Sequence, residues 1–190
     1  KDYEFRVYLT IIIFSSLIIF YSISSADSNW SHGNYIKSLF QSLAILTGTG
    51  YSNADYELWP YLSQHLLLIL MFFGAMGGST SGGMKIARII LLIKHAKTEI
   101  RRMLHVRAII PIKIGSRTIS DEIVRNTLGF SMIYISIFIL TALALSIFNL
   151  DFQSAFGAAA SAIGNVGPAF GEFGPTDNYA LLHPAGKWML

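Results

Sequence analysis

The sequence contains no cysteine and few charged residues. Without Cys, disulfide bonds and thiolate metal sites are excluded, and the redox state of the compartment is left undetermined. Charged residues make up 13% of the 190 residues, about half the usual share in a soluble domain. Together with 53% hydrophobic residues and a mean hydropathy of +0.51, this scarcity of charge indicates an integral membrane protein.

The sequence also lacks an initial Met and a cleavable signal pattern. It begins at Lys1 and stops at Leu190, where an apolar segment is just starting. We therefore expect a fragment of a longer protein.

The net charge of +3 is small, but the basic residues are unevenly placed. Between positions 85 and 125 only Glu99, Asp121 and Glu122 are acidic. A basic run can bind nucleic acid, but between apolar spans it is more typical of the cytoplasmic side of a membrane protein. We therefore predict that this run lies on the cytoplasmic side of the membrane and that the protein binds no nucleic acid. The basic residues of this run are Lys85, Arg88, Lys94, Lys97, Arg101, Arg102, Arg107, Lys113, Arg117 and Arg125.

Three long stretches carry no formal charge. Residues 7–26 and 126–150 are each long enough to cross a hydrocarbon core of roughly 30 Å. Residues 58–84 form the third stretch, but its part 74–83 holds five glycines, each costing about 0.8–1 kcal/mol in a helix. We predict that this span is broken. We expect Asp121 and Glu122 to start the helix of the second complete span.

A short apolar run, residues 38–46, leads directly into Thr47-Gly48-Thr49-Gly50. It is too short to span a bilayer, and irregular backbone at bilayer depth survives only where it lines a cavity or is buried in protein. The pattern predicts a helix that enters the membrane halfway and returns as a loop. We expect its cap near Gly33 and Asn34.

The same order recurs in the second half of the chain. Asp151 is expected to cap an Ala-rich segment, residues 152–163, which runs into Gly164-Asn165-Val166-Gly167. A shift of 117 residues places Gly164 on Thr47 and Asn165 on Gly48. The identity is weak, but the pattern indicates an internal repeat.

These two loops have the chemistry of a filter for monovalent cations. Rows of backbone carbonyls replace water around the ion without fixed charges that would trap it. Gly50 and Gly167 can adopt positive φ and turn successive carbonyls to one side, while Thr47 and Thr49 can add hydroxyl oxygens. The preceding short helices direct their negative ends at the site.

The glycine-rich stretch has three interpretations. Tight helix packing is one, and a re-entrant gate beneath the loops is another. A phosphate-binding loop needs Gly-Lys-Ser/Thr in order, which Gly83-Met84-Lys85-Ile86 breaks. Lys85 and Arg88 follow the stretch as interface anchors with room for a role in gating.

Other functions remain open from the residues alone. Residues 47–51 could be an extracellular turn, and Gly164–Gly167 a close helix contact. An intramembrane protease would use Ser79 or Ser81 with His65 as base, although fourteen residues separate His65 from Ser79. A secondary transporter of organic anions would also have re-entrant loops, but it presents helix N-termini to its substrate.

Several of these motifs together resemble the Trk/Ktr/HKT superfamily of potassium transporters, most closely its bacterial TrkH branch. The likeness spans nearly the whole chain. The residues that carry it are Leu46-Thr47-Gly48-Thr49-Gly50-Tyr51, the runs 77–85 and 107–113, and Gly164-Asn165-Val166-Gly167-Pro168 with Gly171-Glu172. Met76 and Val106 depart from the pattern, which leaves the subtype open.

The resemblance implies an all-α integral membrane protein with four membrane-pore-membrane repeats, re-entrant pore helices and Gly-rich filters. Residues 1–104 would be the third repeat, 105–120 a cytosolic hairpin and 121–190 the truncated fourth repeat. It implies K⁺ as the transported ion, no cofactor, no enzymatic activity, a bacterial inner-membrane location, a homodimer, and a TrkA-type cytosolic nucleotide-binding ring. The carried-over filter residues are Thr47, Gly48, Thr49, Gly50, Gly164, Asn165, Val166 and Gly167. The resemblance also implies that the glycine-rich stretch closes the pore beneath the filter, with gate residues Gly77, Gly78, Ser79, Thr80, Ser81, Gly82 and Gly83.

Overall fold

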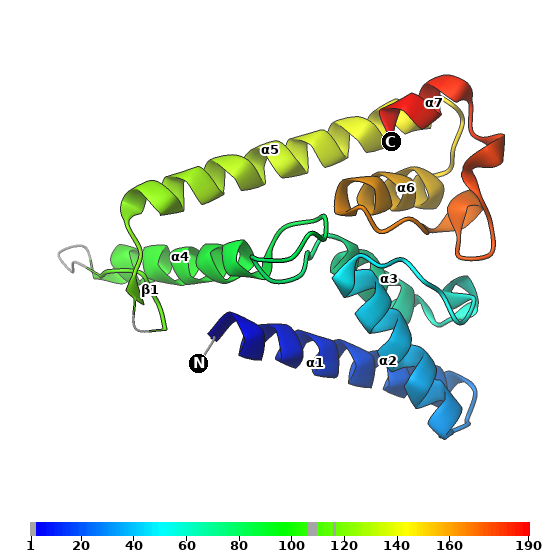
Figure 1. Ribbon diagram of the computed structural model, residues 1–190, viewed down its shortest axis with the longest axis horizontal. Coiled ribbons are helices and arrows are strands. Elements are labelled where there is room, and N and C mark those ends of the chain that lie inside the picture. Colours follow the sequence, from blue (N-terminus) through cyan, green and yellow to red (C-terminus); the bar gives the residue numbers. More distant parts are fainter. Residues whose placement is uncertain (1–2, 106–109, 116) are drawn as a thin grey trace.

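The structure is a computed structural model that describes residues 3–105, 110–115 and 117–190. Val106, residues 107–109 of the run 107–113, and residue 116 of the predicted hairpin lie outside the described residues. The described part is mostly helical (Figure 1). Its α-helices are α1 (Tyr3–Ala26), α2 (His32–Thr47), α3 (Tyr61–Met71), α4 (Ile86–Leu104), α5 (Asp121–Ser146), α6 (Phe152–Gly164) and α7 (Pro184–Met189).

Short elements connect these helices. Strands β1 (Lys113–Ile114) and β2 (Arg117–Thr118) pair antiparallel around Gly115, at the predicted hairpin. Three 3₁₀ turns lie in the loops at the other end of the molecule: η1 (Tyr56–Leu58), η2 (Gly171–Phe173) and η3 (Tyr179–Leu181).

Two helices, α1 and α5, are long and apolar enough to cross a bilayer. They cover the predicted spans 7–26 and 126–150, with α5 ending at Ser146, four residues earlier than expected. Ser120 precedes α5, and Asp121 and Glu122 lie in its first turn as predicted. The third apolar stretch is broken, also as predicted: α3 ends at Met71 and α4 begins at Ile86.

The start of α2 corrects a prediction. The helix begins at His32, so Gly33 and Asn34 lie inside its first turn and are not its cap. The cap is Ser31, whose side chain accepts a hydrogen bond from the Asn34 backbone N–H at 3.2 Å. Because a Ser hydroxyl satisfies one unpaired N–H of the first turn, the helix starts slightly earlier than the predicted cap at Gly33 and Asn34.

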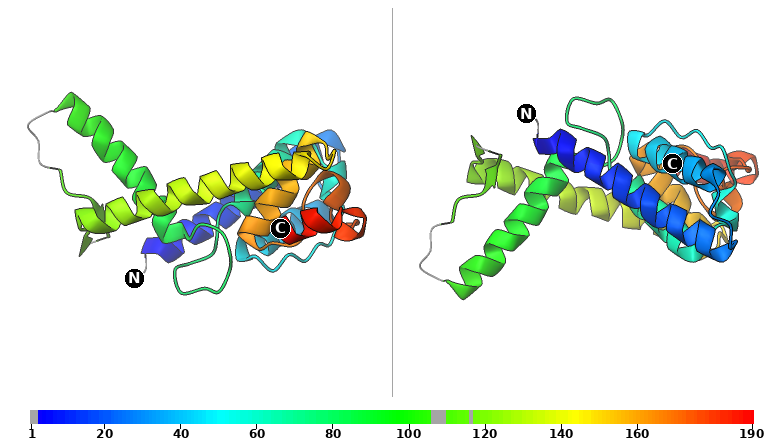
Figure 2. Two further views of the ribbon diagram at one scale, coloured as in Figure 1. Left: turned by 90° about the horizontal axis from the view of Figure 1, so that it is seen from above. Right: turned by 90° about the horizontal axis from the view of Figure 1, so that it is seen from below.

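The helices form one packed body. Figures 1 and 2 show α1 beside α2, α5 along the opposite side, and α6 under the right-hand end of α5. The main core combines Ile19 of α1, Ile45 of α2 and Leu67 of α3 with Ala160 of α6 and Phe170 after it. The two halves of the chain therefore share a hydrophobic core.

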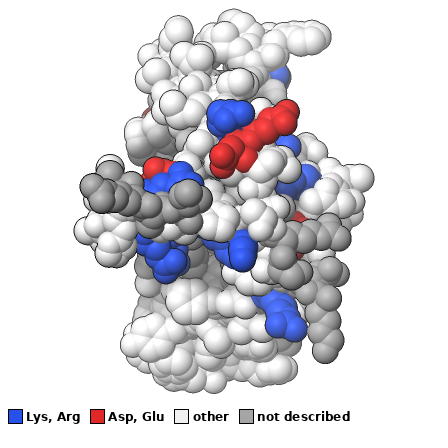
Figure 3. All heavy atoms as spheres, turned by 90° about the vertical axis from the view of Figure 1, so that its left-hand side faces the viewer, with Lys and Arg blue, Asp and Glu red and all other residues white. Residues whose placement is uncertain are grey.

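The basic residues gather at the end that holds α4 and the hairpin. Figure 3 shows this end with Lys and Arg side chains spread around its middle and few acidic ones. The loops with η1, η2 and η3 lie at the opposite end (Figure 1). This separation agrees with the predicted sidedness, because basic residues favour the cytoplasmic face.

Candidate functional site

Helices α2 and α6 end in the same way, 117 residues apart. Each is followed by a left-handed cap: Gly48 has φ 70° and ψ 22°, and Asn165 has φ 51° and ψ 47°. The Gly48 N–H donates to the carbonyls of Ala44 and Ile45, and the Asn165 N–H donates to the equivalent carbonyls in α6. The structure therefore repeats in the register that the sequence predicted.

A second residue with positive φ follows in each loop. Gly50 has φ 68° and Gly167 has φ 107°, as their predicted role requires. We call residues 47–50 the first segment and 164–167 the second segment. The N–H groups of Thr49 and Gly50 donate to the Ala44 carbonyl at 3.0 and 3.3 Å.

In the second segment the equivalent amides, those of Val166 and Gly167, are both bonded by one serine. The Val166 N–H donates to the Ser161 carbonyl at 2.9 Å, and the Gly167 N–H donates to the Ser161 hydroxyl at 3.0 Å. The amides of both segments are thus bonded back to their own helices. Within the described residues, the carbonyls of Gly48, Thr49, Gly50, Asn165 and Val166 accept no hydrogen bond and remain available as ligands.

The threonine hydroxyls are already engaged as donors. Thr47 Oγ1 lies 2.7 Å from the Leu43 carbonyl, and Thr49 Oγ1 lies 3.2 Å from the Ala44 carbonyl. The two hydroxyls are 3.2 Å apart. A hydroxyl oxygen that donates still has lone pairs, so both remain capable of contacting a cation.

The two segments touch through their backbones. A Cβ added to Gly50 would collide with the Val166 carbonyl oxygen and lie 3.2 Å from Pro168 Cδ. A Cβ on Gly48 would lie 3.7 Å from the Asn165 carbonyl oxygen. Because a side chain at Gly50 would push the segments apart, this glycine sets how closely the two rows of carbonyls approach.

The glycine-rich stretch, residues 74–83, forms a loop whose ends meet. The Gly74 N–H donates to the Met84 carbonyl and the Met84 N–H to the Phe72 carbonyl, both at 2.9 Å. A Cβ on Gly82 would collide with the Gly164 carbonyl oxygen and lie 2.7 Å from Asn165 Cβ. This glycine loop therefore packs directly against the second segment.

Two basic residues lie at the end of the glycine loop. The Lys85 ammonium donates to the Ser79 carbonyl at 2.8 Å, to the Ser81 carbonyl, and to the Ser81 hydroxyl at 3.2 Å. The Arg88 guanidinium lies 4.0 Å from the centre of the Phe130 ring on α5. Lys85 is thus in contact with the predicted gate, whereas Arg88 joins α4 to α5.

The exposed tip of the glycine loop contacts α1. The Gly77 N–H donates to Glu4 Oε1 at 2.7 Å, while Gly78, Ser79 and Thr80 are also exposed. Ser81 closes the base, because its hydroxyl accepts from the Ala75 N–H at 2.8 Å. The seven predicted gate residues therefore belong to a single loop.

Loop residues that the sequence analysis did not select hold the backbone after the second segment. The Tyr56 hydroxyl donates to the Ala169 carbonyl at 2.8 Å, and the Glu57 carboxylate accepts from the Gly171 N–H. The Tyr179 hydroxyl donates to the Gly167 carbonyl at 3.0 Å. An acidic residue in a polar loop gives no signal of a partner more than a hundred residues away, so only the fold reveals these bonds.

Electrostatics around Glu57 are unfavourable to its charge. Burial raises the pKa of Glu57 most, and the neighbouring carboxylates Asp55, Asp177 and Asp151 raise it further. The hydrogen bond from Gly171 opposes this shift by stabilising the carboxylate. Burial also raises the pKa of Tyr179, which keeps its hydroxyl a donor at neutral pH.

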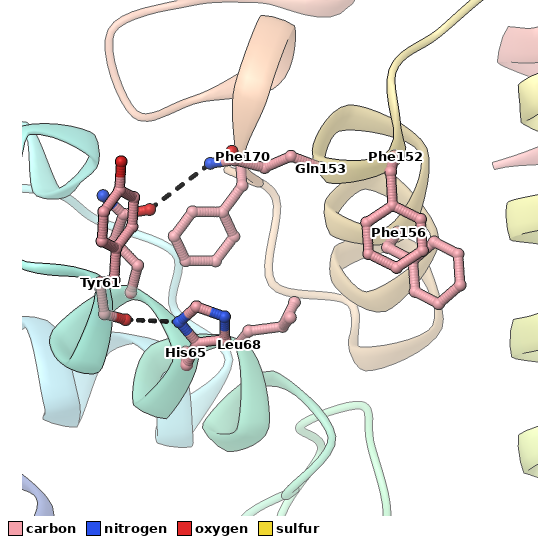
Figure 4. A pocket seen from close by; sticks show the side chains of 8 residues that line it. Tyr61, His65, Leu68, Phe152, Gln153, Phe156 and Phe170 are labelled. Atoms are coloured by element: carbon pink, nitrogen blue, oxygen red, sulfur yellow. Dashed lines mark hydrogen bonds between the residues drawn. The ribbon is translucent and has the colours of Figure 1, made fainter.

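The histidine of the protease alternative lies in a different environment. His65 Nδ1 is 2.6 Å from the Tyr61 carbonyl, beside a mainly aromatic cavity of about 230 Å³ between α3 and α6 (Figure 4). In the described part of the chain, Ser79 and Ser81 bond to the glycine loop and Lys85, and neither bonds to His65. These residues are therefore not arranged as a nucleophile and base.

Comparison with known proteins decides the family. The family model TrkH, described as a cation transport protein, matches residues 6–190. The chain belongs to the TrkH family. The motifs in the two loops and the glycine stretch therefore predicted the family correctly. The family consists of transport proteins, not enzymes.

Individual relatives agree with this assignment. The chain is 32% identical over 201 residues to the Trk system potassium uptake protein TrkH of Salmonella typhimurium and 34% identical over 191 residues to that of Vibrio parahaemolyticus. All of this chain aligns in both comparisons, but it spans only 39% of the length of each relative.

A solved structure shares the fold. The crystal structure of the potassium transporter TrkH from Vibrio parahaemolyticus matches with a TM-score of 0.91 and 33% identity, covering 100% of this chain and 40% of that one. TrkH family membership and the two long apolar helices support a membrane location. No group of three or more His, Asp or Glu side chains that could hold a metal ion occurs among the described residues.

Proposed function

We propose that this TrkH-family chain is part of a protein that takes up K⁺ across the bacterial inner membrane, passively or coupled to another ion. The observation that carries the proposal is the repeated helix end, with left-handed residues at positions 48 and 165 and positive φ again at 50 and 167. Two loops of this form present free carbonyls side by side, which suits a dehydrated monovalent cation.

The direction of the helices favours a cation over an organic anion. Helices α2 and α6 enter the two segments with their C-terminal ends, which carry roughly half a negative charge each. An anion site would need N-terminal ends at the same place. A cation coordinated by the first and second segments is therefore stabilised by both helices.

The filter in this proposal is a ring of four such loops. The first and second segments supply two quarters, as the third and fourth membrane-pore-membrane repeats, and the relatives are long enough to supply the others. The filter ligands are carbonyls of Thr47 to Gly50 and of Gly164 to Gly167. The pore helices that precede them, α2 and α6, enter the membrane halfway.

The glycine loop is proposed as the gate below the filter. It packs on Gly164 and Asn165, and the Lys85 ammonium holds its backbone at Ser79 and Ser81. In this proposal the Lys85 ammonium lies on the ion path and repels K⁺, so the arrangement in which Lys85 holds the loop corresponds to a closed gate. Opening requires Lys85 to release the loop.

The proposed partners follow the family. A cytosolic nucleotide-binding ring of the TrkA type would contact the basic end seen in Figure 3, and two copies of the whole protein would form a homodimer. Both are proposals for the full-length protein, as is multi-pass insertion in the inner membrane. The relatives named above are each called a Trk system potassium uptake protein.

Rubidium uptake tests the function directly. The full-length protein is expressed in cells that lack their own K⁺ uptake, and ⁸⁶Rb⁺ uptake is measured with and without the cytosolic regulator. We expect uptake that K⁺ inhibits and that Na⁺ inhibits much less. Uptake no greater than that of empty cells, with the protein present in the membrane, would refute the proposal.

A further inference from the structure

This chain holds two repeats, which we call the first repeat (residues 1–104) and the second repeat (residues 121–190). Two side chains of the first repeat reach the backbone that follows the second segment. Tyr56 is completely buried, and its hydroxyl donates to the Ala169 carbonyl at 2.8 Å. The next residue, Glu57, accepts the Gly171 N–H with its carboxylate. We call Tyr56 and Glu57 the outer clamp, because they bind two alternate backbone groups from outside the second repeat.

The outer clamp sits on a rigid turn. Asp55 Oδ1 accepts the Glu57 N–H at 3.0 Å and so caps η1. Gln64 Nε2 of α3 donates to the carbonyls of Glu57 at 2.6 Å and Trp59 at 2.9 Å. Because η1 is bonded at both ends, the clamp side chains start from a fixed backbone.

The backbone that the clamp holds is tightly enclosed. The Tyr56 ring packs edge-on against Phe170, with ring centres 5.1 Å apart. Ala169 is buried and its N–H donates to the Phe173 carbonyl at 2.7 Å. Gly171 has φ 68°, and a Cβ there would collide with the Ser154 hydroxyl. This stretch has little freedom to move while the clamp is closed.

The last residue of the second segment, Gly167, is exposed, whereas Gly164 and Val166 are buried. A Cβ added to Gly167 would meet nothing within 4 Å among the described residues. Its N–H and carbonyl are bonded by the hydroxyls of Ser161 and Tyr179. Two residues after Gly167, the chain is buried again at Ala169. The position of Ala169 therefore fixes the chain on the C-terminal side of Val166 and Gly167.

We propose that Tyr56 and Glu57 are positioning residues that set the ion selectivity of the neighbouring filter quarter. By fixing the Ala169–Gly171 backbone, they hold the Val166 and Gly167 carbonyls at the spacing that fits K⁺. This inference rests on the proposed function and adds to it that one repeat controls the filter geometry of the next.

Replacing Tyr56 with Phe in the full-length protein removes the hydroxyl and keeps the ring. We expect the ratio of K⁺ to Na⁺ uptake to fall about two- to tenfold, the range that corresponds to one hydrogen bond. Tyr61→Phe is the matched control, because Tyr61 is 79% exposed and its hydroxyl has no partner in the described part of the chain. The control should keep the wild-type ratio.

Glu57 provides an independent test by conservative rescue. Glu57→Ala removes the acceptor for Gly171 and should lower the ratio, whereas Glu57→Gln keeps an acceptor oxygen and should restore most of it. Glu172→Ala, at an exposed acid on the same held stretch, should leave the ratio unchanged. A loss of folding would reduce the amount of protein in the membrane, but not the ratio.

The outcomes separate this inference from the proposed function. A wild-type protein without preference for K⁺ contradicts the proposed function. A selective wild type whose Tyr56→Phe and Glu57→Ala variants are equally selective contradicts only the clamp. Equal ratios for Glu57→Ala and Glu57→Gln, both below wild type, would also overturn it, because the acceptor oxygen would then not matter.

Discussion

At the scale of single residues, two glycines and one asparagine shape the candidate filter. Gly50 and Gly167 turn the chain with positive φ, and Asn165 takes the left-handed position that Gly48 occupies in the first repeat. Asn tolerates this conformation better than other residues with a side chain. The weak identity between the two loops therefore conceals the same backbone geometry.

Replacing Gly50 with Ser should reduce discrimination between K⁺ and Na⁺. The new Cβ would meet the Val166 carbonyl oxygen, and φ near 68° costs a residue with a side chain about 1 kcal/mol. Competition of Na⁺ with ⁸⁶Rb⁺ uptake measures the effect. Gly33→Ser, at an exposed residue in the first turn of α2, is the control, where a Cβ would come no closer than 3.7 Å to Ser31. Unchanged selectivity in Gly50→Ser would contradict the filter assignment.

The raised pKa of Glu57 predicts a pH-dependent stability. The folded protein binds the Glu57 proton more tightly than the unfolded chain does, so this group adds stability as the pH falls through its folded pKa. Glu57→Gln removes that gain. We expect the melting temperature of the wild type relative to Glu57→Gln, measured in detergent, to rise from neutral pH toward the ordinary pKa of Glu. A constant difference would show that the carboxyl is not perturbed.

At the scale of elements, the break between α3 and α4 is the feature with the clearest mechanical consequence. Helix α3 has only 11 residues, and the chain leaves it to form the glycine loop before α4 begins. A hydrogen bond between Gly74 and Met84 closes the loop at its base, and the Lys85 ammonium bonds to the Ser79 carbonyl inside the loop. A loop with an exposed tip and a bonded base can move without unfolding the helices beside it.

Lys85→Gln should raise ion flux in the absence of the cytosolic regulator. The substitution removes a charge from the proposed ion path and weakens bonds of the kind that contribute about 1.5–3 kcal/mol each, so we expect an increase of about tenfold or more. Initial rates of ⁸⁶Rb⁺ uptake by the full-length protein measure it. Lys97→Gln, at an exposed lysine of α4, the helix that directly follows Lys85, is the control. A Lys85→Gln protein with wild-type flux would exclude the lysine from the gate.

At the scale of the whole molecule, the two repeats are joined by a shared core and by direct backbone contacts. Aromatic rings continue across the boundary, from Phe72 after α3 to Phe138 of α5 at 4.8 Å and on to Phe156 of α6 at 5.5 Å. The glycine loop of the first repeat touches the second segment through Gly82. Displacement of either repeat would therefore disturb both candidate filter loops.

Gly82→Ala should destabilise this joint. The added methyl group would collide with the Gly164 carbonyl oxygen, and overpacking of this kind costs about 1–3 kcal/mol. We expect a lower melting temperature and altered ⁸⁶Rb⁺ flux in the full-length protein. Gly78→Ala in the same loop is the control, because a Cβ there would have no neighbour within 4 Å. Equal stability of the two variants would mean that the loop does not pack on the second segment.

The sequence alone determined the family, the two long apolar helices, the break at the glycine stretch and the repeat of 117 residues. These features depend on hydropathy, on glycine spacing and on local caps such as Asp151, whose side chain accepts the Ser154 N–H at 3.2 Å. All of them act over a few residues, so they can be read along the chain.

Only the tertiary structure decided which parts of the two repeats meet. The contact of Gly82 with Gly164 and the bonds from Tyr56 and Glu57 to the second repeat join residues far apart in the chain. Such pairs depend on how two complete repeats pack together, and no local pattern of residues encodes that arrangement.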